Sequence, residues 1–392
     1  MKLNFINKQL KVDDFLKLSA FCLVFPAYID FFVSKSPFVQ GISYFAYILP
    51  VAILLLNYKI NISKSFIIFW FIFLSLWIIP SIINLYSGRL ESDRIFLHAL
   101  IAKLFFLTII VIFARSLFIF FSHNEYKKLF ISILIFYIPL IFMIFISCIK
   151  ELNIFLGCSE CRIHPYGNLP FFVSELLLLG IALSFYIDKF WPKLCLIMLC
   201  TISLIILQGR AAIIASFFGL FVLLYFPYLK KNLYKFTSWF LLALLLFISL
   251  VIFNFLINNT SLGSRDFSTL SGRLFMYELS INSIKDNPFF GIGFQVTPNY
   301  YNFINHNHNV IHNFFLRIAT ENGLIVLFFV LSFILVSFLK MIKNNDFVEL
   351  SFLISFIIYN SLSTRHLSLN LFNILFYIIL TRSFYSKHQI KS

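Results

Sequence analysis

Charged residues are scarce in this sequence. They make up 12% of its 392 residues, about half their usual share in a soluble domain, while hydrophobic residues make up 60%. Long runs of alternating polar and apolar residues are also missing, which argues against the strands of an outer-membrane barrel. The composition therefore predicts an all-α, polytopic membrane helix bundle, because helices satisfy their own backbone hydrogen bonds in lipid.

Several motifs that define enzyme classes are absent as well. Without GxxxxGK[ST] the sequence has no phosphate loop for nucleotide hydrolysis, and without a DxD pair a metal-held nucleotide sugar is not expected. No GxSxG nucleophile elbow points to an esterase. We therefore expect neither a cofactor nor a metal. The net charge of +15 reflects lysines in short loops and does not indicate a nucleic-acid partner.

The six cysteines form no disulfide framework. Cys158 and Cys161 form a CxxC pattern in a loop, where a local disulfide or a free pair is expected, because the context of a redox motif is missing. The first apolar block lacks a small-residue cleavage site and is expected to remain as an anchor. The other four cysteines lie in apolar segments and are expected to be inert packing residues: Cys22, Cys148, Cys195 and Cys200.

About twelve apolar segments of roughly span length follow one another along the chain. They divide it into spans one to nine over residues 1–257, a long polar loop over 258–313, and spans ten to twelve over 314–392. Lysine-rich and lysine-poor connections alternate, which predicts cytoplasmic termini and an outward-facing loop. The segments lie near residues 15–33, 39–56, 65–86, 96–114, 129–149, 170–187, 190–207, 211–228, 236–257, 314–339, 347–362 and 368–385.

Three arginines, Arg210, Arg273 and Arg365, lie at outward positions that the positive-inside rule does not explain. Arg210, in LQGRAAII, is expected to start a helix, where free N–H groups and the helix dipole favour an anion. Arg273 opens an expected amphipathic helix over 271–287, which Asn287-Pro288 ends. Two such Gly-Arg pairs suit a pyrophosphate, although an arginine that reaches lipid headgroups is the alternative for Arg210. The apolar face of the helix is expected to consist of Leu274, Tyr277, Ile281 and Ile284.

Three histidines lie within seven residues at the end of the polar loop: His306, His308 and His312. Their HxHxxxH spacing would allow a zinc site, but no Asp, Glu or Cys lies within the cluster, so a metal is disfavoured. His312 is the better candidate for a proton acceptor, because HNFFL leads directly into the next span and fixes its depth. His306 and His308 are interpreted as polar loop residues, with His308 kept as a substrate-binding candidate.

Two further basic residues are candidates for substrate binding. Lys103 lies near the middle of the fourth expected span, where a charge costs about 2.5–3.5 kcal/mol on insertion scales. It is therefore expected to face the bundle interior or a cavity, or else to be paired or to reach the headgroups. Arg365, in STRHLSLN, lies between the last two spans on the outward side.

Three stretches resemble, in their order and placement, the O-antigen ligase family of polytopic membrane glycosyltransferases. They are LQGRAAII, SGRLFMYELSINSIKDNPFFGIG and HNVIHNFFLRIATENGLIVL. The N-terminal half is similar in hydropathy alone, and Ile325-Val326 stands where the family has a glycine after NGL. The resemblance implies a GT-C-like bundle of about twelve transmembrane helices with one long periplasmic loop, in the bacterial inner membrane.

The resemblance also implies an activity: metal-independent, inverting transfer of a glycan from undecaprenyl pyrophosphate to lipid A–core oligosaccharide at the periplasmic face. In that reaction Arg210 and Arg273 would hold the pyrophosphate and His312 would accept the acceptor's proton, while Arg365 matches a further family arginine. An O-antigen polymerase and a protein O-oligosaccharyltransferase remain open. So does a lipid-linked glycan flippase, although a flippase would need charges through many spans and only Lys103 is clearly mid-membrane.

Overall fold

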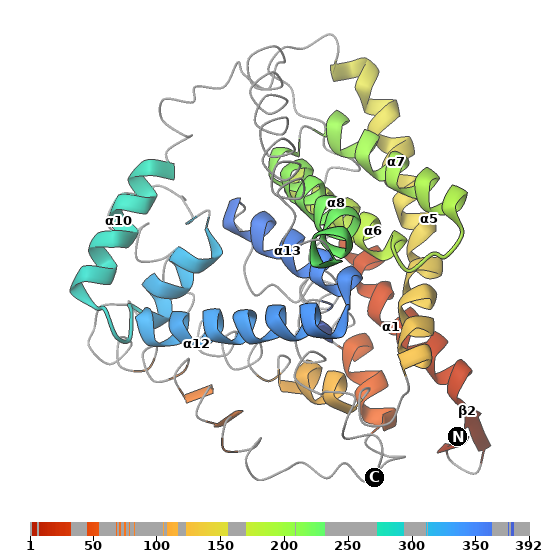
Figure 1. Ribbon diagram of the computed structural model, residues 1–392, viewed down its shortest axis with the longest axis horizontal. Coiled ribbons are helices and arrows are strands. Elements are labelled where there is room, and N and C mark those ends of the chain that lie inside the picture. The colour runs from red at the N-terminus through yellow and green to blue at the C-terminus, as the bar shows by residue number, and fades with distance from the viewer. Residues whose placement is uncertain are drawn as a thin grey trace.

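The protein is a bundle of helices with a short hairpin at its N-terminus (Figure 1). The computed structural model describes residues 2–5, 8–32, 45–54, 108–116, 123–155, 170–207, 209–231, 273–293, 311 and 313–362, with a few scattered positions between 68 and 105 and at 375–379. Cys158, Cys161 and the expected span near 236–257 lie outside the described residues, as do most of the spans near 65–86 and 368–385.

The hairpin consists of β1 (Lys2–Phe5) and β2 (Lys8–Lys11), which pair antiparallel with Lys2 opposite Lys11. These two strands were not expected from the sequence. Helix α1 begins directly after them at Val12 and carries Asp13 and Asp14 in its first turn, where the helix dipole favours negative charge.

Helices occupy the expected apolar segments wherever the structure describes them, so the all-α prediction is confirmed apart from the hairpin. Among the described helices, residues 124–151 and 314–344 are each long and apolar enough to cross a membrane. A shorter apolar helix lies over Phe45–Leu54. The labelled helices are α1 (Val12–Phe32), α5 (His123–Phe155), α6 (Pro170–Ser184), α7 (Phe190–Ile206), α8 (Arg210–Lys231), α10 (Arg273–Asp286), α12 (Phe314–Asn344) and α13 (Phe347–Leu362).

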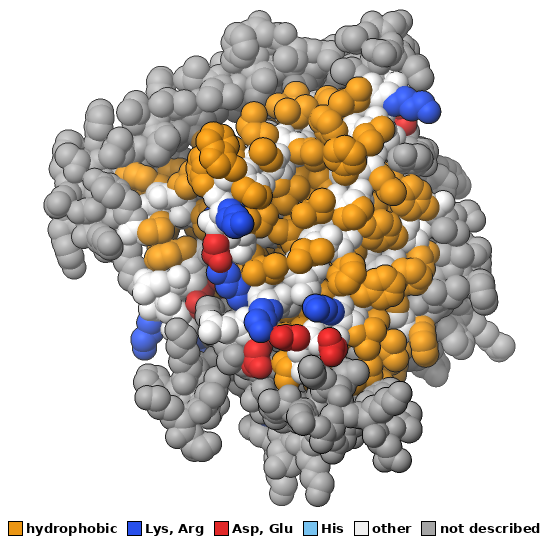
Figure 2. Space-filling model, turned by 90° about the vertical axis from the view of Figure 1, so that its right-hand side faces the viewer, with side chains coloured by type: hydrophobic (Ala, Val, Ile, Leu, Met, Phe, Trp, Pro, Cys, Tyr) orange, Lys and Arg blue, Asp and Glu red, His pale blue; other side chains and the backbone are white. Residues whose placement is uncertain are grey.

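The exposed side chains of helix α5 are apolar over a length that matches the hydrocarbon core of a membrane. Lys128 near its start and Lys150 near its end are both exposed and lie ~33 Å apart at 1.5 Å per residue, close to the thickness of a hydrocarbon core. Figure 2 shows a broad apolar face on this side of the molecule, with most of the charged side chains gathered near its border. The outward apolar side chains of α5 include Ile135, Ile138, Phe142, Met143, Ile146 and Ile149.

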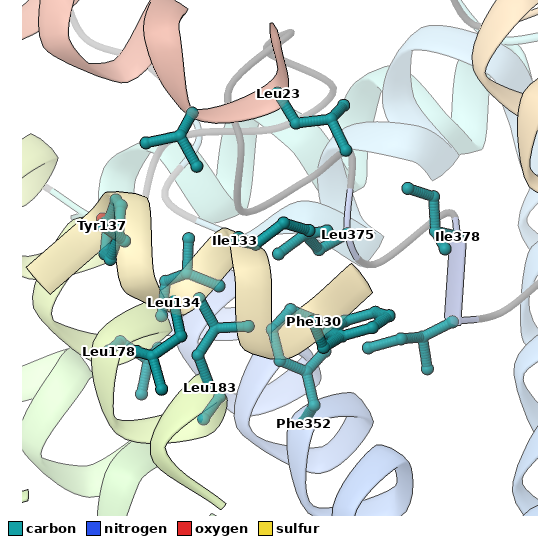
Figure 3. Packing of buried hydrophobic residues seen from close by; sticks show 14 of the residues in the cluster. Leu23, Phe130, Ile133, Leu134, Tyr137, Leu178, Leu183, Phe352, Leu375 and Ile378 are labelled. Carbon is teal, nitrogen blue, oxygen red and sulfur yellow. The ribbon is translucent and has the colours of Figure 1, made fainter. Parts of the chain in front are cut away.

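The core lies between α1, α5, α6 and α13 (Figure 3), and hydrogen bonds from two tyrosines link these helices. The buried Tyr137 hydroxyl donates to the Leu176 carbonyl oxygen at 3.0 Å, which links α5 to α6. The Tyr28 hydroxyl of α1 donates to the Phe136 carbonyl oxygen at 2.7 Å. These partners remove the cost of burying a hydroxyl in apolar surroundings.

Helices α8 and α13 run antiparallel and approach each other closely. The Ser355 hydroxyl donates to the Ala215 carbonyl oxygen at 3.0 Å, and the Ser351 hydroxyl donates to the Gly219 carbonyl oxygen at 2.6 Å. A Cβ atom at Gly219 would collide with Ser355 Oγ. Small residues at a helix–helix contact permit this approach, and their hydroxyls add bonds across it.

Gly219→Ala should therefore destabilise the protein by about 1–3 kcal/mol, the usual cost of overpacking a tight contact. Adding Ser355→Ala should recover most of the loss, because it removes the obstructing oxygen at the cost of one hydrogen bond. Thermal unfolding of both variants in detergent measures the two effects. A double variant less stable than Gly219→Ala alone would contradict this description of the interface.

Candidate functional site

Helix α8 begins at Arg210, as the sequence predicted, directly after a tight contact with α6. A Cβ atom at Gly209 would lie 2.5 Å from Ser174 Oγ. The Gly209 N–H donates to the Leu204 carbonyl oxygen at 3.1 Å, and the Gly209 carbonyl accepts from Ile213 at 2.9 Å. Glycine is thus needed here for close packing between α6 and the turn that leads into α8.

Helix α10 runs over Arg273–Asp286 and ends before Asn287-Pro288, within two residues of the predicted bounds. Of its predicted apolar face, Tyr277 borders the cluster of Met276 and Ile311, whereas Ile281 is 47% exposed. The buried positions are instead Met276, Ser280 and Ser283, at helical spacing. The two serine hydroxyls donate to carbonyl oxygens one turn earlier, at 2.6 and 2.9 Å, so their burial leaves no polar atom unpaired.

The first part of α12 lies beside α10 and runs in the same direction. Met276 of α10 packs with Ile311, and Leu316 borders the same cluster. Asn313 caps α12, its side-chain Oδ1 accepting the Leu316 N–H at 2.9 Å. Met276, which lies one helical turn after Arg273, thus contacts Ile311, the residue that precedes His312 in the sequence.

Helix α12 is interrupted at Gly323, and the turn that follows α10 packs against this break. Gly323 has φ 81° and ψ 172°, which frees main-chain groups on both sides of it. The Ile292 and Gly293 N–H groups donate to the carbonyl oxygens of Thr320 and Glu321, both at 2.8 Å, and the Leu324 N–H donates to the Pro288 carbonyl oxygen at 2.7 Å. We call residues 288–293 and 320–324, joined in this way, the glycine interlock.

Glycine is required at two positions of the glycine interlock. A Cβ atom at Gly323 would collide with the Phe289 carbonyl oxygen, and one at Gly291, which has φ 67°, would lie 2.5 Å from the Thr320 carbonyl oxygen. Both backbones are in the left-handed region that L side chains rarely adopt. The turn-rich DNPFFGIG stretch of the sequence therefore becomes a fixed attachment between α10 and α12.

A buried ion pair lies just before the break in α12. Arg317 Nε donates to Glu321 Oε1 at 2.8 Å, and the two side chains are 7% and 1% exposed. The next residue, Asn322, is also buried, and neither of its side-chain amide atoms has a hydrogen-bond partner among the residues that the structure describes. Sequence reasoning placed Arg317 inside a span without a role, although the i,i+4 spacing of Arg317 and Glu321 was a visible signal.

The starts of α8, α10 and α12 lie at the same end of the bundle. Phe314, the first residue of α12, packs edge-on against Phe356 of α13, with ring centroids 6.2 Å apart. The neighbouring Ser355 bonds Ala215 of α8, which is five residues, or ~7.5 Å of helix, after Arg210. Figure 1 shows the start of α12 beside the end of α13.

The remaining predicted site residues are not placed. Lys103, His308, His312 and Arg365 lie outside the described residues, and so do the side chains of Arg210 and Arg273, whose backbones start their helices. The zinc alternative at His306, His308 and His312 falls outside as well. Within the described ranges no group of three His, Cys, Asp or Glu side chains could hold a metal ion.

Comparison with known proteins finds no curated protein that matches the chain. Residues 194–331 match a family model described as O-antigen ligase. The match extends from α7 to the middle of α12 and includes Arg210, Arg273, His308 and His312, but neither Lys103 nor Arg365. The matched range therefore contains the three helix starts and the glycine interlock, and this part of the membrane protein is similar to the O-antigen ligase family.

Proposed function

We propose that the protein transfers a polysaccharide from undecaprenyl pyrophosphate to lipid A–core oligosaccharide at the periplasmic face of the bacterial inner membrane. The family supports a ligase- or polymerase-type role in O-antigen handling. The observation that carries the finer proposal is that the starts of α8, α10 and α12 lie at one end of the bundle. Free N–H groups at helix starts, together with arginines there, suit a pyrophosphate.

The proposed reaction needs little beyond binding and one proton transfer. Arg210 and Arg273 hold the pyrophosphate and stabilise its charge as the bond between the sugar C1 and the phosphate oxygen breaks. His312 accepts the proton of an acceptor hydroxyl as that oxygen attacks C1 with inversion. Pyrophosphate is a good leaving group, so the mechanism requires no strong general acid, metal or nucleotide.

Asn313 and the glycine interlock support this assignment of His312. The Asn313 cap fixes where α12 begins, and the glycine interlock fixes α12 against α10. Together they hold Asn313 at a fixed place relative to α10, and His312 is adjacent to Asn313 in the sequence. A general base must be held within hydrogen-bond reach of its proton, so this rigidity favours a catalytic role.

An O-antigen polymerase is the main alternative, because it would use the same donor and a second lipid-linked glycan as acceptor. Deletion of the gene followed by gel analysis of lipopolysaccharide distinguishes the two. A ligase deletion should leave bare core and accumulate the lipid-linked O-chain. A core that carries a single repeat in the deletion strain would instead identify a polymerase, and unchanged lipopolysaccharide would contradict both.

A further inference from the structure

The guanidinium of Arg317 makes a hydrogen bond through its Nε edge only, among the residues that the structure describes. Its Nε donates to Glu321 at 2.8 Å, while neither Nη nitrogen bonds any residue in the described part of the chain. The Nη nitrogens also differ from the side-chain amide of Asn322, whose unpaired atoms are fully enclosed. The Nη donors of Arg317 are therefore not fully enclosed, although only 7% of its side chain is exposed.

Burying the Arg317–Glu321 pair costs free energy of folding unless the Nη groups of Arg317 bind a further partner. Taking an ion pair out of water costs several kcal/mol per ion, and each N–H left unpaired in a buried place adds to that cost. Glu321 offsets the charge of Arg317 but satisfies only part of a planar group with five donors. A phosphate-type oxyanion is the ligand that the remaining fork fits best, because it accepts two parallel N–H bonds.

The position of Arg317 places this fork near the proposed reaction. Arg317 follows the Asn313 cap by four residues, and its own N–H donates to the Asn313 carbonyl oxygen at 2.9 Å. Helical side chains lean toward the N-terminus of their helix, so Arg317 and Glu321 both lean toward the end of α12 next to His312. The free N–H groups of that helix start add further positive potential.

We propose that Arg317 is a third anion-binding arginine of the site, and that Glu321 orients it so that both Nη groups face a phosphate-type oxyanion. The inference rests on the proposed function, which supplies the substrates. The oxyanion belongs either to the donor pyrophosphate or to an anionic group of the acceptor. The glycine interlock contributes by fixing the Glu321 backbone through its carbonyl oxygen.

Two substitutions of the full-length protein test this role. Arg317→Lys keeps a charge beside Glu321 but removes the two-pronged donor. Arg317→Gln combined with Glu321→Gln removes both charges, so no unpaired ion stays buried. The matched control is Lys128→Gln with Asp13→Asn, which neutralises an exposed pair of similar length, 2.9 Å, at the start of α5. The readouts are the Kd for undecaprenyl pyrophosphate, the KM for lipid A–core, and thermal unfolding.

Arg317→Lys and the double variant should each raise the Kd for undecaprenyl pyrophosphate roughly 10- to 100-fold, the value of charge-assisted hydrogen bonds, with the control unchanged. A rise confined to the KM for lipid A–core would assign the same oxyanion site to the acceptor. Folded Arg317→Lys with neither constant changed would overturn the proposal. If the wild-type protein does not bind undecaprenyl pyrophosphate, the proposed function is contradicted. If the wild-type protein binds it and the variants keep the same Kd and the same KM for lipid A–core, only the role of Arg317 is contradicted.

Discussion

Replacing His312 by alanine should lower turnover by roughly 10²–10⁴, the usual contribution of a positioned general base, and leave donor affinity nearly intact. In the proposed reaction the imidazole acts on the acceptor proton, and the pyrophosphate is bound by Arg210 and Arg273. Activity of the native enzyme should also fall on the acid side, where the imidazole becomes protonated and can no longer accept a proton. Donor binding and turnover measured on the same preparation separate these effects.

Two other variants sharpen that result. His306→Ala removes a histidine from the same stretch and should leave turnover near the wild-type value. Arg210→Ala should weaken donor binding as well as turnover, because the pyrophosphate is charged in both the ground and the transition state. If His312→Ala abolished donor binding while Arg210→Ala left it unchanged, the two roles would be assigned to the wrong residues.

Gly323→Ala should be the most damaging substitution of a residue outside the reacting groups. The backbone at φ 81° costs an alanine about 1–3 kcal/mol, and the added Cβ collides with the Phe289 carbonyl oxygen. Relief of the collision would separate the turn from α12 and break the three main-chain hydrogen bonds. We expect a loss of about 2–5 kcal/mol in stability, together with reduced turnover.

Thermal unfolding and limited proteolysis between α10 and α12 measure the effect of Gly323→Ala. Ser337→Ala is a suitable control, since Ser337 is a buried residue of the same helix whose hydroxyl bonds only its own preceding turn, at Phe333. That control should change stability by less than about 1 kcal/mol. Equal melting temperatures for Gly323→Ala and Ser337→Ala would show that the glycine interlock does not stabilise the protein.

Features of the sequence that act locally predicted the structure well. The start of α8 at Arg210, the end of α10 before Asn287-Pro288, and α13 over Phe347–Leu362 all follow from apolar runs and helix-stop signals. The buried face of α10 could not be predicted this way. Serines at 280 and 283 are buried because α12 packs closely against α10, and hydropathy cannot register a contact between segments.

The break in α12 shows a second limit of local reasoning. FFLRIATENGLIVL is apolar on average and predicts one continuous span, and only the docking of residues 288–293 makes a left-handed backbone at Gly323 favourable. The same averaging gives no weight to the Arg317–Glu321 pair, although its i,i+4 spacing is visible in the sequence. Of the site, the sequence therefore predicted the helix starts, while their relative placement required the tertiary contacts.

The glycine interlock is built from main-chain atoms, and this has a consequence for how the region tolerates change. Its three hydrogen bonds place no demand on the side chains of the residues between Pro288 and Gly291. Phe289 and Phe290 are both exposed on the turn that the interlock fixes. Other residues can therefore occupy these two positions while the backbone that carries them stays in place, so related proteins are free to diverge in shape and polarity beside the break in α12.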